Sequence, residues 1–272
     1  MKNHNLSTIP EEFEKYLTKF EEAKYFAAIK AGGECLNDSL AHSLRILYGL
    51  GLYPLVVHGG GRQIDEALES KGIASKKING KRVTDKRTLG VVVETLTRVN
   101  REFGSKVNQL GNCAEMLNGV FYVDGLDPVY GYVGNVIGIN KEKIDDCIGK
   151  RLITIISCIG VNGKGQYRNL NADSAYKFLV SELRPVKVII LTSNGGVYRN
   201  TELIPEMKEE ELDRFLKSSY VDGGMKLKLE EARELVIRGF DVQITNPEHL
   251  IEELFSDKGY GTYLHRRESR AF

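Results

Sequence analysis

The chain has 272 residues, 42% of them apolar, and 38 basic side chains balance 37 acidic ones to a net charge of +1. This length and composition allow a sizeable core and suit one large α/β domain or two coupled lobes. The balanced charge, with no long run of one sign, gives no indication of a nucleic-acid or membrane partner.

Neither a targeting segment nor a metal site is indicated. The N-terminus lacks an apolar signal core, and no stretch approaches the ~20 apolar residues that a membrane span needs. The cysteines have no CxxC spacing, so we interpret them as reduced and predict no structural zinc. They are Cys35, Cys113, Cys147 and Cys158. We therefore expect a soluble, cytoplasmic protein that holds no metal of its own.

The first predicted element is a helix that precedes the first strand. Residues 8–11 have the form of a capping box with an early proline. Apolar side chains then recur with helical spacing at Phe13, Tyr16, Leu17 and Phe20. This stripe predicts an amphipathic helix that packs either on its own domain or on a partner chain.

Strand-length apolar runs then alternate with helical patterns along the chain. Strands are predicted over 25–29, 55–57, 152–160, 186–193 and 242–245, and helices over 40–48, 64–68, 172–183 and 226–239. This rhythm predicts βαβ units and a largely parallel sheet. Between 119 and 140 we expect one or two antiparallel hairpins laid against that sheet.

Three glycine clusters follow predicted strands, at the sheet edge where α/β proteins gather their ligands. They are Gly32-Gly33 after Lys30, Gly59-Gly60-Gly61, and Gly195-Gly196. Glycines that adopt positive φ angles can present backbone amides to an anion, although each cluster alone could be a plain turn. The sequence has no P-loop motif, and no cluster completes GxGxxG. A bound phosphate would therefore need a different kind of binding site.

Further polar residues stand near predicted helix starts. Arg82 follows a turn glycine, and Asn169, Asn171 and Asp173 precede or open a helix. Each of the three could cap the helix or lie in the loop before it, or could line a ligand site. Two lysines, at 226 and 228, follow a glycine pair at a predicted helix start. The helix dipole disfavours lysine there, so they are either solvent-facing or serve a separate purpose.

In their order, these segments resemble the amino-acid kinase family, and specifically the N-acetyl-L-glutamate kinases. The matching segments are IKAGG, HGGGRQID, NGKRVT, NLNADSA, LTSNGGVY, GGMKLK and ELFSDKGYGT. The resemblance runs from about residue 25 to residue 264. The leading segment, YGYVGNV and the C-terminal region are most similar to the kinase half of bifunctional N-acetylglutamate synthase/kinase proteins, and we expect no acetyltransferase domain here.

The resemblance implies a fold and a reaction. The fold is a three-layer αβα sandwich with a central, mainly parallel sheet, in a single amino-acid kinase domain. Within it, 1–22 is an N-terminal helix, 23–175 an acceptor-binding lobe and 176–272 a nucleotide-binding lobe. The implied reaction, a step of arginine biosynthesis, converts ATP, carried with Mg²⁺, and N-acetyl-L-glutamate to ADP and N-acetyl-L-glutamyl 5-phosphate.

The resemblance also implies a role for each matching residue. Lys30 and Lys228 would contact the transferring phosphoryl group, and Asp173 would orient both. The acceptor would be held by Gly59, Gly60, Arg82 and Asn169. The nucleotide would be held by Gly32, Gly33, Ser193, Asn194, Gly195, Gly196, Tyr198, Tyr220 and Asp222. Such a set makes chemical sense, because transfer to a carboxylate needs charge neutralisation and in-line positioning and no general base.

Arginine-inhibited members of the family use a helix before the first strand for oligomerisation. Arginine then binds between that helix and the C-terminal region. The resemblance therefore implies a homo-oligomer formed through the N-terminal helix and an effector region at Glu253, Gly259 and Gly261.

Three positions depart from the family pattern. Arg62 stands where the glycine loop usually carries proline, Glu34 stands where a small residue is common, and Ser193-Asn194 replaces an aspartate-containing turn. These changes would retune substrate choice or weaken catalysis. The alternatives are therefore a kinase for another carboxylate, such as aspartate or an α-aminoadipate derivative, or a non-catalytic arginine sensor. A pure sensor would have no use for the full set of matching charged residues.

Overall fold

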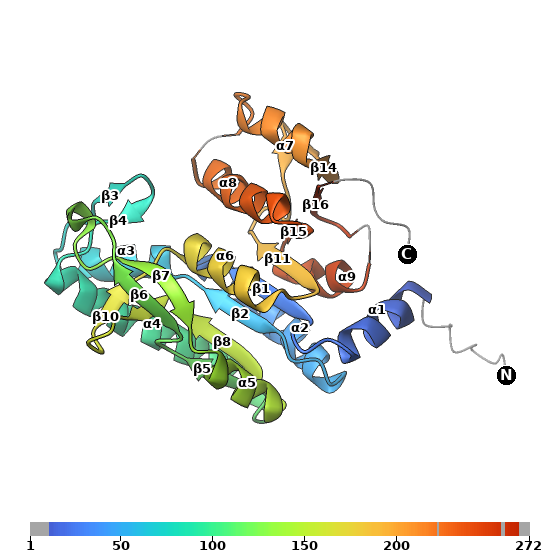
Figure 1. Cartoon of the computed structure of the whole chain (residues 1–272), viewed down its shortest axis with the longest axis horizontal. Coiled ribbons are helices and arrows are strands. Elements are labelled where there is room, and N and C mark those ends of the chain that lie inside the picture. Colours follow the sequence, from blue (N-terminus) through green and yellow to red (C-terminus); the bar gives the residue numbers. More distant parts are fainter. Residues whose placement is uncertain (1–10, 222, 257–258, 267–272) are drawn as a thin grey trace.

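The structure, a computed structural model, describes residues 11–221, 223–256 and 259–266. Within these residues the chain builds a central sheet of eight strands (Figure 1). In order across the sheet the strands are β14 (Glu206–Lys208), β16 (Thr262–His265), β15 (Val242–Thr245), β11 (Lys187–Leu191), β1 (Ala27–Ala31), β2 (Leu55–His58), β8 (Ile153–Ser157) and β5 (Ala114–Leu117). All neighbouring pairs are parallel except β15 with β16. The predicted, mainly parallel sheet is confirmed.

Helices cover both faces of this sheet because its strands are apolar on both sides. In β11, Val188 and Ile190 point into one core, and Ile189 and Leu191 into the other. The first core contains α5 (Lys141–Gly149), α6 (Ala172–Leu183), α7 (Glu209–Leu216) and α8 (Gly223–Ile237). The second contains α1 (Glu11–Glu21), α2 (Asp38–Gly49), α4 (Lys86–Val107) and α9 (Leu250–Leu254). The predicted three-layer sandwich is therefore confirmed.

A smaller sheet packs against the first core. Its order is β10 (Tyr167–Asn169), β9 (Ile159–Val161), β6 (Phe121–Gly125) and β7 (Gly134–Ile139). The β6–β7 pair is antiparallel, which confirms one predicted hairpin. The single strand predicted over 152–160 is wrong, because the chain leaves the large sheet at Cys158 and continues as β9 in the small sheet.

The longest described helix, α4, is absent from the predicted elements. It contains 22 residues and starts at the cap of Asp85, whose side chain accepts a hydrogen bond from the Thr88 amide at 2.7 Å. Its β-branched run at 91–93 is typical of a strand, and its buried side includes Thr95 and Asn100. A prediction from apolar spacing alone misses such a helix, because part of its buried side is polar.

The remaining described elements are a helix, two short hairpins and four 3₁₀ turns. They are α3 (Gly61–Ser70), the hairpins β3 (Lys77–Ile78) with β4 (Lys81–Arg82) and β12 (Tyr198–Arg199) with β13 (Glu202–Leu203), and the 3₁₀ turns Gly33–Cys35, Asn108–Leu110, Pro128–Tyr130 and Pro247–His249. None of the helices within the described ranges is both long and apolar enough to cross a bilayer.

The apolar stripe of α1 packs on its own chain. Phe20 is 2% exposed, and Phe13 stacks on Phe255 with 4.1 Å between ring centroids. Of the two predicted alternatives, the structure shows packing on the domain to which the helix belongs. The predicted capping box at 8–11 lies mostly outside the described residues.

Strand β1 lies at the centre of the large sheet, between β2 and β11. Strands from residues 55–157 lie on one side of it, and strands from residues 187–265 on the other (Figure 1). One sheet runs through both halves, so the division into acceptor and nucleotide lobes near residue 175 stays a prediction.

Candidate active site

A cavity of about 420 Å³ opens beyond the carboxyl ends of β1 and β2. It brings together residues that are far apart in the sequence. All residues predicted to contact the phosphoryl group or the acceptor line it, together with the first glycine pair. They are Lys30, Gly32, Gly33, Gly59, Gly60, Arg82, Asn169, Asp173 and Lys228.

Lys30 and Asp173 form an ion pair in this cavity. Hydrogen-bonded neighbours on both sides hold the backbone of β1, and Lys30 is only 4% exposed. A buried ammonium group needs an anionic partner, which Asp173 supplies from the first turn of α6. Asn171 caps that helix by accepting from the Ser174 amide at 2.8 Å. The capping interpretation of Asp173 is therefore wrong, and its carboxylate is available to Lys30.

Lys228 reaches the cavity from α8 on the opposite half of the chain. This helix begins at Gly223, earlier than predicted, so the glycine pair lies inside its first turn. Lys228 consequently lies in the second turn and is half-buried. The other lysine of the pair, Lys226, does not line the cavity.

Cys158, where β8 gives way to β9, also lines the cavity. Burial raises the pKa of its thiol to about 12. The thiol therefore stays protonated near neutral pH and is neither a nucleophile nor a base. The groups that carry charge at this position are Lys30 and Asp173.

The prediction of positive φ angles for Gly59, Gly60 and Gly61 is wrong, since none of the three adopts them. These glycines are needed because neighbouring helices come close. A Cβ on Gly59 would lie 3.1 Å from Cβ of Ala172, and one on Gly60 would lie 2.9 Å from Cδ2 of Leu96. The Gly59 amide donates to the Ala31 carbonyl at 3.2 Å. Of the two predicted donors, only the Gly60 amide has no acceptor within the described residues.

The first glycine pair forms a short 3₁₀ turn between β1 and α2. The side chain of Gln63 donates to the Gly33 carbonyl at 3.0 Å, and any Cβ on Gly33 would collide with that side chain. Glu34 is exposed, and its carboxylate lies beside Gly32. This departure from the family pattern therefore puts a negative charge at the rim of the cavity.

Arg62, the other charged departure, turns outward. Its side chain is 77% exposed and pairs with Glu66 one turn along α3 at 2.8 Å. Although Arg62 is among the residues that line the cavity, its guanidinium is held by Glu66 on the helix surface.

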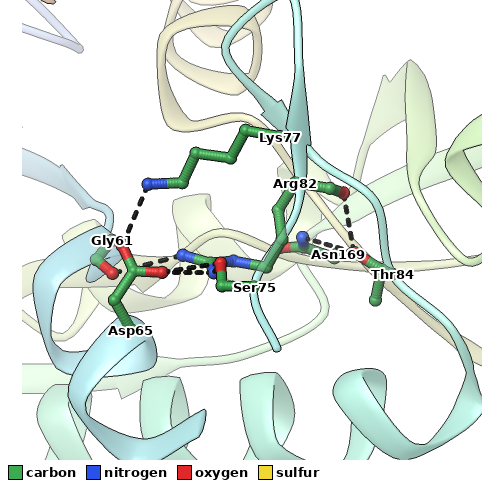
Figure 2. A network of polar contacts seen from close by, with 7 residues as sticks. All are labelled: Gly61, Asp65, Ser75, Lys77, Arg82, Thr84 and Asn169. Atoms are coloured by element: carbon green, nitrogen blue, oxygen red, sulfur yellow. Dashed lines mark hydrogen bonds and ion pairs between the residues drawn. The ribbon is translucent and has the colours of Figure 1, made fainter. Parts of the chain in front are cut away.

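Arg82 and Asn169 belong to one polar network (Figure 2). Asn169 donates to the Thr84 hydroxyl at 3.0 Å, and that hydroxyl donates to the Arg82 carbonyl at 2.9 Å. The Arg82 guanidinium donates to Asp65 and Ser75, and also to the Gly61 carbonyl at 3.2 Å. The two predicted acceptor residues are thus linked through Thr84.

Sequence reasoning missed Asp65, Ser75, Lys77 and Thr84. Acidic residues are common on the polar side of an amphipathic helix, so the presence of Asp65 in the sequence signals no ligand. Only the folding of the 75–82 segment back onto α3 shows what Asp65 contacts.

The residues predicted to hold the nucleotide beyond the first glycine pair lie elsewhere. Tyr220 lines a second cavity of about 400 Å³, together with Arg199, Arg214 and Phe215. Ser193, Asn194, Gly195, Gly196 and Tyr198 line neither of these two cavities. Both glycines are tightly packed, Gly195 against Asn246 and Gly196 against Leu203. Asp222 lies outside the described residues.

The predicted effector region surrounds a buried carboxylate. Glu253 is 2% exposed and accepts hydrogen bonds from the Gly261 amide and, at 3.1 Å, from the Gln243 side chain. Burial raises the pKa of Glu253. A Cβ on Gly259 would collide with this carboxylate, and one on Gly261 with the Ile244 carbonyl. Both glycines are therefore required by packing around Glu253.

A buried lysine separates Glu253 from α1. The ammonium of Lys187 donates to the Glu253 and Ser256 carbonyls, at 3.2 and 2.9 Å, and lies 4.3 Å from the centroid of the Tyr16 ring. The predicted effector region thus contacts the N-terminal helix through this side chain.

Comparison with known proteins places the chain in a family. The model of the amino acid kinase family matches residues 26–246. Acetylglutamate kinase of Xanthomonas campestris is 36% identical over 94% of this chain, which spans 63% of that relative's length. Acetylglutamate kinase of Pelagibacter ubique is 31% identical over 93% of this chain and 92% of its own length.

The fold comparison agrees with the sequence comparison. A crystal structure of N-acetylglutamate synthase from Neisseria gonorrhoeae superposes with a TM-score of 0.82 at 20% identity, over 94% of this chain and 64% of that one. The family match spans most of the chain and includes both lysines at the cavity. The chain belongs to the amino acid kinase family.

Proposed function

We propose that this chain transfers the γ-phosphoryl group of ATP to the side-chain carboxylate of N-acetyl-L-glutamate, a step of arginine biosynthesis. The observation that carries the proposal is the cavity in which the Lys30–Asp173 pair, Lys228, Arg82 and Asn169 converge. The relatives named acetylglutamate kinase, at 31–36% identity, support the choice of acceptor.

In the proposed reaction a carboxylate oxygen of the acceptor attacks the γ-phosphorus. The bond from that phosphorus to the bridging oxygen of ADP breaks, and ADP leaves with the electron pair. Because the attacking carboxylate is already ionised, the step needs no proton acceptor. Lys30 and Lys228 offset the repulsion between the two anions, and Asp173 holds Lys30 in position.

At the other end of the acceptor, Arg82 and Asn169 would bind the α-carboxylate, and the Gly60 amide would bind the acyl side. Arg82 is 7% exposed, so its guanidinium acts in surroundings largely free of water. A buried guanidinium that binds one carboxylate suits an acceptor with two carboxylates, one held by Arg82 and the other free to receive the phosphoryl group.

ATP would lie with its phosphates at Gly32 and Gly33, and Mg²⁺ would accompany it. In the portion of the chain that the structure describes, no cluster of three or more His, Cys, Asp or Glu side chains could hold a metal. The cavity side chains therefore fit a metal held mainly by the nucleotide phosphates and water.

The direct test is ADP release with N-acetylglutamate, glutamate and aspartate as separate acceptors. We expect turnover with N-acetylglutamate, and trapping of the acyl phosphate as a hydroxamate when hydroxylamine is added. Faster turnover with another acceptor would replace the proposed substrate. Absence of turnover with all three would favour the non-catalytic sensor.

The lysines provide the first test by mutation. Replacing Lys30 or Lys228 by alanine removes a charge from the transferring group, so we expect kcat to fall on the order of 10²-fold or more. Lys226→Ala on the same helix is the matched control and should retain activity, because Lys226 does not line the cavity. Near-normal turnover of folded Lys30→Ala and Lys228→Ala proteins would contradict the mechanism.

Oligomerisation through α1 and an arginine site near Glu253 are separate proposals. The position of Lys187 between Tyr16 and Glu253 supports a link between the helix and the effector region. With Phe13 and Phe20 packed on their own chain, a partner would contact the exposed side of α1, which includes Thr18. Mass measurement by light scattering, with and without Thr18→Arg, tests the contact.

A further inference from the structure

One carboxylate ties the β3–β4 hairpin to α3. Oδ1 of Asp65 accepts from Arg82 and, at 2.9 Å, from the Ser75 hydroxyl, while Oδ2 accepts from the Lys77 ammonium at 2.9 Å (Figure 2). Nη1 of Arg82 also donates to the Ser75 hydroxyl. All the partners of this carboxylate lie between residues 75 and 82, so Asp65 sets the position of that segment over the cavity.

These contacts use the two Nη nitrogens of the Arg82 guanidinium. The group has five N–H donors in a rigid fork. Nη1 donates to Asp65 and Ser75, and Nη2 donates to the Gly61 carbonyl. No acceptor among the described residues uses Nε, and Nη2, which has two hydrogens, has one acceptor there, the Gly61 carbonyl. Adjacent Nε and Nη2 hydrogens form an edge that can bind a carboxylate with two parallel hydrogen bonds.

The charges of the network leave room for one anion. The Arg82 side chain is 6% exposed, and burial of an unpaired guanidinium would be costly. Burial alone would raise the pKa of Asp65, but hydrogen bonds from Arg82, Lys77 and Ser75 outweigh it and hold that pKa well below its usual range. Two cations and one anion therefore leave a single net positive charge at neutral pH, which one carboxylate would balance.

We propose that Asp65 is a positioning residue that fixes the guanidinium of Arg82 so that its Nε–Nη2 edge meets the α-carboxylate of the acceptor. This inference rests on the proposed function, which supplies that carboxylate. Thr84 joins Asn169 to the backbone carbonyl of Arg82, so it fixes Asn169 relative to the main chain of Arg82 and leaves the guanidinium to be positioned by Asp65. The Lys30–Asp173 pair shares none of these contacts, so loss of Asp65 should impair acceptor binding and spare phosphoryl transfer.

The experiment is Asp65→Asn, which keeps the size of the side chain and removes its charge. We expect KM for N-acetylglutamate to rise about tenfold or more, with kcat and KM for ATP within about twofold of the parent. Glu69→Gln, one turn further along α3 and exposed, removes the same charge and should leave all three constants unchanged. Thermal unfolding checks that each variant is folded.

A double-mutant cycle separates positioning from a general effect on the fold. In an Arg82→Lys background the oriented fork is absent, so adding Asp65→Asn should change KM by less than about twofold. Independent, multiplicative effects would overturn the proposal. An unchanged KM in Asp65→Asn alone would also overturn it, because Asp65 would then contribute nothing to acceptor binding. A lower KM would overturn it as well, because Asp65 would then only repel the acceptor. If Asp65→Asn does not fold, Ser75→Ala replaces it, with an expected rise in KM of about threefold.

A substrate-independent measurement keeps the two proposals apart. In ¹⁵N-labelled protein, the Nη signals of Arg82, assigned by their loss in Arg82→Lys, should be resolved in the parent and averaged in Asp65→Asn. The same Nη spectrum in both proteins would refute the positioning role. A parent protein that leaves N-acetylglutamate unphosphorylated would refute the proposed function, while this spectrum would still decide the role of Asp65.

Discussion

At the scale of single residues, Asp65 links the stability of the fold to the proposed acceptor site. Its folded-state pKa lies well below the usual range of a carboxyl group, because hydrogen bonds from two cations and a hydroxyl outweigh the effect of burial. A carboxyl group with a lowered folded-state pKa stabilises the folded state above its unfolded-state pKa, and that contribution is lost as the pH falls below it.

Asp65→Asn should therefore lower the free energy of unfolding more at pH 7 than at pH 3. At pH 3 the Asp65 carboxyl group is largely protonated in the unfolded chain but still ionised in the folded protein. Part of its contribution to the free energy of unfolding is therefore already lost at that pH. Urea unfolding of the parent, Asp65→Asn and Glu69→Gln at both pH values provides the measurement. Equal losses at pH 7 and pH 3 would contradict the assigned cause of the pKa shift.

Motif order predicted which residues meet at the cavity, although not how they are held. Lys30, Asp173 and Arg82 stand in short segments whose order is specific. Their partners were harder to predict, because Asp65 and Thr84 are ordinary helix and loop residues until the chain folds. The positive φ angles predicted for the glycine cluster at 59–61 were wrong. Gly59 and Gly60 are needed because neighbouring helices come close to them.

At the scale of elements, an ionic contact sets how α6 and α8 lie against each other. Lys177 on α6 forms ion pairs with Glu231 and Glu234 on α8, at 2.7 and 2.6 Å, and its side chain is 18% exposed. Burial works against its charged form, but the two carboxylates outweigh burial and raise the pKa of Lys177. Asp173 precedes Lys177 by one turn, and Lys228 precedes Glu231 by about one turn. The contact therefore sets the spacing between Asp173, which holds Lys30, and Lys228.

Lys177→Met keeps the apolar stem and removes the charge. Without the ion pairs, α6 and α8 should shift relative to each other. We expect kcat to fall about tenfold, with KM for the acceptor little changed, because small displacements of catalytic groups are costly. Steady-state kinetics tests this, with Lys150→Met as the control, since Lys150 pairs with Asp146 on the surface of α5. A variant with a raised KM and normal kcat would show that Lys177 acts elsewhere.

Periodicity in the sequence identified most of the strands of the large sheet and several of the helices that cover it. It failed where tertiary contacts decide, as in α4, whose buried face includes Thr95 and Asn100. It also failed at Cys158, because a continuous apolar run does not show where a strand exchanges one set of neighbours for another.

At the scale of the whole molecule, α1 closes one end of the second core. Phe20 contacts Phe26 and Phe255, with ring centroids 5.1 and 5.4 Å apart. The helix is thus part of the fold of its own chain, and this packing must be separated from any role in assembly.

Phe20→Ala should destabilise the protein by about 3–5 kcal/mol, because it leaves a cavity among buried rings. Urea unfolding gives the magnitude, and Phe20→Leu should cost less. A loss below about 1 kcal/mol would show that the stripe contributes little within its own chain. If α1 serves assembly through its exposed side, Phe20→Ala should keep the mass of the parent protein.

The central place of β1 has a consequence for dividing the polypeptide. Residues 27–31 pair with 187–191 along their whole length, yet they belong to different halves of the sequence. Separate production of residues 1–184 and 185–272 would leave each fragment with an unsatisfied sheet edge that matches the other. The halves are thus suited to reconstitution in trans. Recovery of the proposed phosphotransfer activity on mixing would then report the encounter of two proteins fused to them.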